Sequence, residues 1–151
     1  MIAYIRWTSI ILLTFLIQGK VSLFDIPPNF TSVLAYYAGI RNGETKGMFL
    51  GSLIGIIEDS LSATFLGPSL LSKGLVGYFS SFMSGSFFRW TPLLGIIGIS
   101  ILTLVDSIVV LISRGIFDRM PVSIGAAVFI VTIQSMINAP LGIFLRPKNV
   151  Q

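Results

Sequence analysis

Six apolar blocks follow one another along the chain, separated by short stretches that carry prolines or charges. The blocks cover about residues 4–24, 30–40, 46–65, 68–88, 91–113 and 122–145. Apolar and polar residues do not alternate with period two, and most blocks exceed the roughly ten residues of a membrane-barrel strand. Because a backbone in lipid must satisfy its own hydrogen bonds, the pattern favours helices. We therefore expect an all-α polytopic membrane protein that folds as one domain, a six-helix transmembrane bundle.

The second block is the shortest and follows a rigid break. Residues 25–29 (Asp-Ile-Pro-Pro-Asn) precede it, and proline lacks an amide proton and restricts the residue before it. Pro28 and Asn29 resemble the start of a short helix, so we place the second span at 28–40. About eleven apolar residues rise only about 16 Å, so this span must start as early as Val21 or lie tilted and shallow.

Other breaks define the remaining spans. Residues 41–46 (Arg-Asn-Gly-Glu-Thr-Lys) are the most polar stretch and predict a loop. Gly67-Pro68, Trp90-Thr91-Pro92 and residues 118–121 separate the later blocks. At the start of the chain, Arg6 before an apolar run is also typical of a cleavable signal peptide, but no Ala-x-Ala site follows and five more blocks do. A retained first span is therefore expected.

The composition supports lipid as the solvent and excludes several chemistries. Hydrophobic residues make up 54% of the chain and charged residues 11%, against about 25% charged in a typical soluble domain. The chain has no cysteine and no histidine. That excludes disulfides, Cys/His metal sites, haem ligated through either residue, and Ser-His or Cys-His nucleophile pairs. We expect no metal and no cofactor.

The ten basic residues lie singly near the ends of the predicted spans, which indicates topology rather than a nucleic-acid-binding patch. With six spans, alternate loops share a side of the membrane. The larger basic group is then expected in the cytoplasm, together with both termini. That group is Arg6, Arg41, Lys46, Arg89, Arg146 and Lys148, whereas Lys20, Arg114 and Arg119 fall on the opposite side.

The sharpest local pattern is a run of glycines at every fourth position. Gly47, Gly51 and Gly55 share one ridge of a helix, and Asp59 ends it. Glycines there remove side-chain bulk and let another helix approach closely. The ridge is interpreted either as a packing groove or as a groove that, with its terminal carboxylate, binds a partner or ligand.

Several polar residues interrupt the apolar blocks and are candidates for burial. Lys73 lies in the fourth block, where it either snorkels to the headgroups or pairs with Glu58 or Asp59. Asp106 is the most isolated charge. Gln134 and Asn138 share a helix face and could bond Asp106 or Asp59, or form ordinary interhelical hydrogen bonds.

Catalysis is not expected from these residues. Glu58 and Asp59 are adjacent carboxylates, and paired carboxylates can divide acid and base roles. Adjacent residues on a helix, however, point about 100° apart, and no second catalytic group stands at a recognisable spacing.

The order of motifs over about residues 27–78 resembles a known family. The motifs are Ala-Tyr-Tyr-Ala-Gly-Ile-Arg at 35–41, a short polar turn, Gly-x3-Gly-x3-Gly-x2-Glu-Asp at 47–59, Leu-Gly at 66–67 and Leu-Val-Gly-Tyr at 75–78. This order is similar to that of the rod shape-determining MreD family, in which a Pro-rich start of a short second helix, a Gly-x3-Gly-x3-Asp third helix, a Leu-Gly turn and a Gly-Tyr in the fourth helix recur. The last two spans match in character alone, and Glu58 and Lys73 depart from the pattern. The matching positions are Pro27, Pro28, Gly51, Gly55, Asp59, Gly67, Gly77 and Tyr78.

The resemblance implies a non-enzymatic scaffold in the bacterial inner membrane that regulates cell shape and peptidoglycan synthesis. Its implied partners are MreC and MreB, alongside the RodA glycosyltransferase and its class B penicillin-binding protein. On this hypothesis the glycine groove, Asp59, Gly77 and Tyr78 form contacts within the bundle or with the single membrane helix of MreC.

The family is also similar in fold to the S components of energy-coupling-factor vitamin transporters, which are six-helix bundles. The alternative hypothesis is therefore a substrate-binding S component. It requires a polar pocket built from the loops between the first and second, third and fourth, and fifth and sixth spans. Asp106, Gln134 and Asn138 could help line that pocket.

Overall fold

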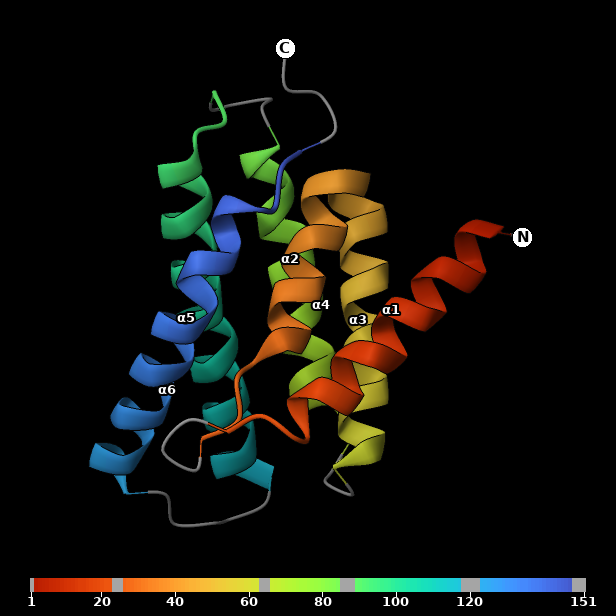
Figure 1. Ribbon diagram of the computed structural model, residues 1–151. Helices are drawn as coiled ribbons and strands as arrows, with labels where there is room; N and C mark the ends of the chain where they lie inside the picture. Colours follow the sequence, from red (N-terminus) through yellow and green to blue (C-terminus); the bar gives the residue numbers. More distant parts are fainter. Residues whose placement is uncertain (1, 23–25, 63–65, 85–88, 118–122, 148–151) are drawn as a thin grey trace.

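The computed structural model describes residues 2–22, 26–62, 66–84, 89–117 and 123–147, and these fold into six α-helices with no strand (Figure 1). The expected all-α class is confirmed. Two helical segments in the described part, Pro92–Phe117 and Ile124–Ile143, are long and apolar enough to cross a membrane. The helices are α1 (Ile2–Gln18), α2 (Phe30–Asn42), α3 (Glu44–Leu61), α4 (Pro68–Ser80), α5 (Pro92–Phe117) and α6 (Ile124–Asn138), and two 3₁₀ turns, η1 (Ser81–Met83) and η2 (Ala139–Ile143), follow α4 and α6.

Helices α2 to α6 run alternately up and down in Figure 1, and α1 crosses obliquely at the edge of the bundle. The most extensive contact joins α3 to α4, and α2 packs against both. The last turn of α3 lies at the same end of the bundle as the first turns of α4 and α6. We call this the α3–α4 end. It positions the candidate site described below.

Apolar and polar side chains are distributed unusually between the interior and the surface. A buried apolar cluster lies between α2, α3, α4 and α5 and includes Tyr36, Ile54 and Ile99. Yet Asp59, Lys73 and Asp106 are buried as completely as this cluster. Large apolar side chains are instead exposed on the outer faces of the helices, among them Leu12, Phe49, Leu71, Leu104 and Phe129.

The predicted loop at residues 41–46 is wrong. Helix α2 continues to Asn42 and α3 begins at Glu44, so Gly43 alone separates them. Gly43 has a φ of 81°, a conformation that glycine adopts without steric cost. The side-chain amide of Asn42 donates a 2.8 Å hydrogen bond to the carbonyl of Ala38, which satisfies one of the last carbonyls of α2. Polar residues here occupy the exposed ends of two helices.

Other span boundaries differ from expectation. The fourth span was expected over 68–88, but α4 ends at Ser80, where the Ser80 and Ser81 hydroxyls donate to the carbonyls of Gly77 and Tyr78 and the chain tightens into η1. The sixth, expected over 122–145, leaves α-geometry after Asn138 because Pro140 has no amide to donate. Helix α5 extends beyond the predicted 113 to Phe117. Helix α1 ends at Gln18 rather than near the predicted 24, and α3 ends at Leu61 rather than near the predicted 65. Residues 24, 65, 88 and 122 themselves lie outside the described residues.

Candidate functional site

The glycine ridge of α3 faces α4 of the same chain. Gly47, Gly51 and Gly55 are all buried. A methyl group added at any of them would overlap a main-chain carbonyl of α4. The groove is therefore filled from within the chain, and a second protein's helix has no room in it. The carbonyls concerned are those of Gly77, Lys73 and Ser69, respectively.

Asp59, at the end of this ridge, caps helix α4 across the α3–α4 turn. Helix α4 has no side-chain cap of its own, because its N-cap residue is Gly67. The Asp59 carboxylate accepts hydrogen bonds from the amides of Gly67 at 2.9 Å, Ser69 at 3.1 Å and Leu70 at 3.2 Å. A carboxylate at this position satisfies unpaired amides and complements the helix dipole. The structure thus gives this buried acid partners on the backbone rather than on Lys73.

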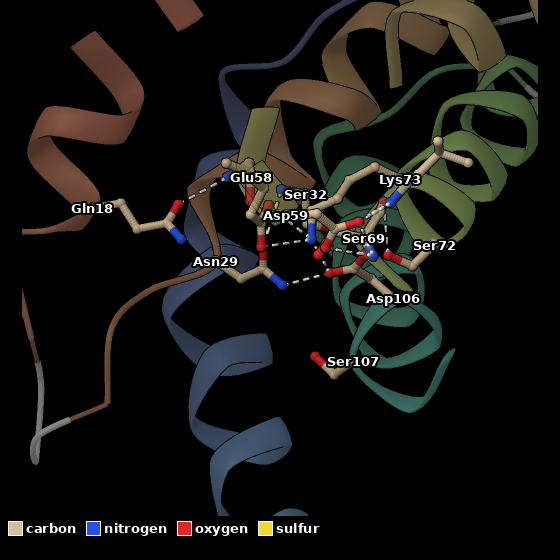
Figure 2. A network of polar contacts seen from close by, with 12 residues as sticks. Gln18, Asn29, Ser32, Glu58, Asp59, Ser69, Ser72, Lys73, Asp106 and Ser107 are labelled. Carbon is tan, nitrogen blue, oxygen red and sulfur yellow. Dashed lines mark hydrogen bonds and ion pairs between the residues drawn. The ribbon is translucent and has the colours of Figure 1, made fainter. Parts of the chain in front are cut away.

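Lys73 lies between two carboxylates at the centre of the site. Its Nζ atom is 3.1 Å from an oxygen of Glu58 on α3 and 3.2 Å from Oδ2 of Asp106 on α5 (Figure 2). The lysine is 1% exposed and Asp106 is fully buried, whereas Glu58 is 17% exposed. The snorkelling interpretation of Lys73 is therefore wrong. The ion cluster Glu58–Lys73–Asp106 links three helices, which offsets part of the cost of burying each charge.

Asn29 joins the start of α2 to this cluster. Its side-chain amide donates to Asp106 Oδ2, and its side-chain oxygen accepts from the amide of Ser32 at 3.1 Å as the N-cap of α2. Asn138 in turn donates to the main-chain carbonyl of Asn29 at 2.9 Å and to the Thr103 hydroxyl at 3.2 Å. The polar segment that starts α2 is therefore held by both α5 and α6.

Gln134 makes the neighbouring link. Its amide donates to the carbonyl of Pro27 at 3.0 Å, and its side-chain oxygen accepts from the Ser107 hydroxyl at 3.2 Å. Neither Gln134 nor Asn138 bonds Asp106 or Asp59 directly. They form interhelical hydrogen bonds around the cluster instead.

A cavity of about 390 Å³ opens beside the ion cluster. Polar side chains from five helices line it, and α5 and α6 supply an apolar wall. This volume falls within the range of small-molecule sites. The charged lining residues are Glu58, Lys73, Asp106 and Arg114, joined by Gln18, Asn29 and Gln134.

Gly77 and Tyr78 do not belong to this site. Gly77 packs against the main chain of Gly47, toward the other end of the α3–α4 hairpin. The Tyr78 ring is half-buried and meets Phe79 and Phe82 edge-on, with ring centroids 5.4 and 5.5 Å away. Gly77 and Tyr78 therefore lie along the α3–α4 hairpin with Asp59, but they do not line a common pocket.

The sequence interpretation missed four residues of this site: Asn29 as a partner of Asp106, Thr103, Ser107 and Arg114. A signal for two of them was present. Thr103 precedes Asp106 by three positions and Ser107 by four. On one helix, Thr103 therefore lies on the same face as both residues. Asn29 was interpreted only as a helix start and Arg114 only as a topology signal.

The arrangement has the chemistry of a charged binding site. No group of three or more His, Cys, Asp or Glu side chains in the described part of the chain is placed to hold a metal ion. What the cavity offers is two carboxylates, an ammonium and a guanidinium above an apolar wall. Comparisons of the chain with models of protein families, with curated sequences and with solved structures find no match.

Proposed function

We propose that the chain is a non-enzymatic scaffold subunit of the bacterial cell-elongation complex, of the MreD type, with all six helices in the inner membrane and both termini in the cytoplasm. The observation that carries the proposal is that the motif residues of the resemblance serve one structural unit. Gly51 and Gly55 allow α3 and α4 to touch, and Asp59 caps α4 at Gly67.

The distribution of side chains supports the membrane part of the proposal. The buried charged groups Asp59, Lys73 and Asp106 have polar partners, and many large apolar side chains face outward, the arrangement expected where the surroundings are apolar. Helices α2 and α4 have 13 residues each, which rise about 20 Å. They reach the headgroups by way of tilt, local thinning of the bilayer or flanking polar residues.

A scaffold role follows from stiffness rather than from chemistry. Helices that touch through glycine backbones, and an ion cluster that ties α3, α4 and α5, give a rigid body. Such a body transmits position between a cytoplasmic filament of MreB and a periplasmic synthase. Because α4 fills the glycine groove, the MreC helix would contact the outer apolar faces.

Co-purification tests the scaffold proposal. The tagged chain is expressed with MreC and MreB from its own genome and captured in mild detergent. MreC is expected to co-purify with the wild-type chain in stoichiometric amount. A tagged, unrelated six-span membrane protein serves as the control and should capture no MreC. A well-folded chain that captures no MreC would contradict the proposal.

The cavity favours a second candidate, a substrate-binding S component of a vitamin transporter. It lies at the α3–α4 end, where Gln18, Pro27 and Ser62 bring the ends of neighbouring segments into its lining. Two observations discriminate between the candidates. A vitamin that co-purifies tightly, or a neighbouring gene for a transporter ATPase instead of MreB or MreC, would favour this second function.

A further inference from the structure

Two buried polar atoms at the cavity have neither a hydrogen-bond partner nor an ion-pair partner among the described residues. Asn29 and Lys73 both donate to Oδ2 of Asp106, which leaves its Oδ1 without a partner. The Nε of Arg114 is likewise unpaired. Buried polar groups are satisfied in most native proteins, so unpaired atoms indicate groups that a ligand or water completes. Both residues line the same cavity.

Charge is separated along this cavity. At the inner part, two carboxylates surround one ammonium, which leaves a formal charge of −1 by the count of Glu58, Asp106 and Lys73. Arg114 carries the compensating positive charge, eight residues further along α5, about 12 Å of helix rise. A ligand that neutralises both regions must carry a cation at one end and an anion at the other.

The wall between the two charged regions is apolar. Val110 and Leu111 of α5 face Ala127, Ile130 and Val131 of α6 across it. A ligand lying here therefore meets hydrocarbon along its length. A single metal cation would leave Arg114 unpaired, and a simple anion would be repelled by the inner carboxylates.

We infer that the cavity binds a zwitterion whose primary ammonium lies against Asp106 and Glu58 and whose phosphate or carboxylate lies against Arg114. The ammonium supplies hydrogen-bond donors to Asp106 Oδ1, and the anion accepts from the guanidinium. The chemistry is that of an ethanolamine phosphate, which reaches the protein either as a phospholipid headgroup or as a free molecule. This inference requires neither the scaffold function nor vitamin transport.

Native mass spectrometry of the purified chain in detergent tests the inference. The probes are phosphatidylethanolamine, free O-phosphoethanolamine, and phosphatidylglycerol, which keeps the phosphate but lacks the ammonium. The first probe, or the first two, should bind saturably at one site, and phosphatidylglycerol at least about tenfold more weakly. Binding of the lipid alone identifies a headgroup, and binding of both identifies a site that free zwitterions reach.

Matched variants locate the site. Arg114→Gln should weaken ethanolamine-phosphate binding about tenfold or more, because it removes the charge that faces the anion. Arg41→Gln changes the same residue type at the exposed end of α2 and should leave binding unchanged. Since the Arg114 Nε has no hydrogen-bond partner among the described residues, thermal melting should show both variants folded. Equal binding by the two variants, equal affinity for phosphatidylglycerol, or no saturable binding of any probe would each overturn the inference.

Discussion

Two charged residues near the α3–α4 turn are satisfied in different ways. Asp59 accepts hydrogen bonds from three main-chain amides of the α4 start, whereas Lys73 depends on the side chains of Glu58 and Asp106. A backbone cap fixes the geometry of a turn. A side-chain ion pair fixes the relative position of whole helices. Substitutions at the two positions therefore have different expected effects.

Removal of the cap should weaken the hairpin. Asp59→Ala leaves the first amides of α4 without partners and is expected to lower the free energy of unfolding by about 2 kcal/mol. Asp59→Asn keeps one acceptor oxygen and should cost about half as much. Unfolding in mixed detergent micelles, followed by circular dichroism, measures both. Equal losses for the two variants would show that the charge, not the acceptor, is what α4 requires.

The glycine ridge gives a second residue-scale prediction. Gly51→Ala places a methyl group against the Lys73 carbonyl, and the helices must separate, at an expected cost of about 1–3 kcal/mol. The control is Gly115→Ala on α5, where the added methyl meets no atom within 4 Å. It should be neutral or stabilising by up to about 1 kcal/mol. If Gly51→Ala and Gly115→Ala were equally stable, the close packing of the glycine ridge against α4 would be contradicted.

At the scale of elements, the ion cluster is the link between the α3–α4 hairpin and α5. Asn29 brings the start of α2 to the Asp106 carboxylate, so α2, α3, α4 and α5 all contribute to the ion cluster and its direct partner. This convergence gives the α3–α4 end a cavity with fixed walls. At the opposite end of the bundle, the single residue Gly43 connects α2 to α3.

The Lys73 ammonium is expected to be coupled to Asp106. Lys73→Met leaves two carboxylates buried without a counter-charge and should cost roughly 3–5 kcal/mol. The double variant Lys73→Met/Asp106→Asn should recover part of that loss, because the inner region then carries one charge less. A double-mutant cycle of unfolding free energies gives the coupling, expected at about 1–3 kcal/mol. Additive effects would mean that the two groups do not interact.

The sequence predicted element types better than element ends or partners. Apolar blocks and glycine spacing are local signals, and they correctly indicated helices and a close-packing ridge. The ends of α4 and α6 were missed because they depend on single residues inside apolar blocks. These are the hydrogen bonds of the Ser80 and Ser81 hydroxyls to main-chain carbonyls, and the missing amide proton of Pro140. The sequence correctly indicated Glu58 as one of two candidate partners for Lys73. The hydrogen bond between Lys73 and Asp106 joins residues 33 positions apart, which no local pattern reveals.

At the scale of the whole molecule, three charged side chains (Asp59, Lys73 and Asp106) are buried in the bundle, and many large apolar side chains are exposed on its outer faces. The proposed membrane account explains this distribution and puts the cavity and the start of α6 on the side away from the cytoplasm. It puts the α2–α3 turn on the cytoplasmic side. The two sides are therefore distinguishable by the chemical accessibility of single residues.

Cysteine labelling in intact cells tests this account most directly, since the native chain has no cysteine to give background. Thr45→Cys marks the start of α3, and Ser123→Cys marks the residue before α6; both positions are exposed. A membrane-impermeant maleimide should label Ser123→Cys in intact cells, and Thr45→Cys only after the membrane is opened. Labelling of both variants from outside, or of neither until lysis, would contradict the proposed crossing of the bilayer.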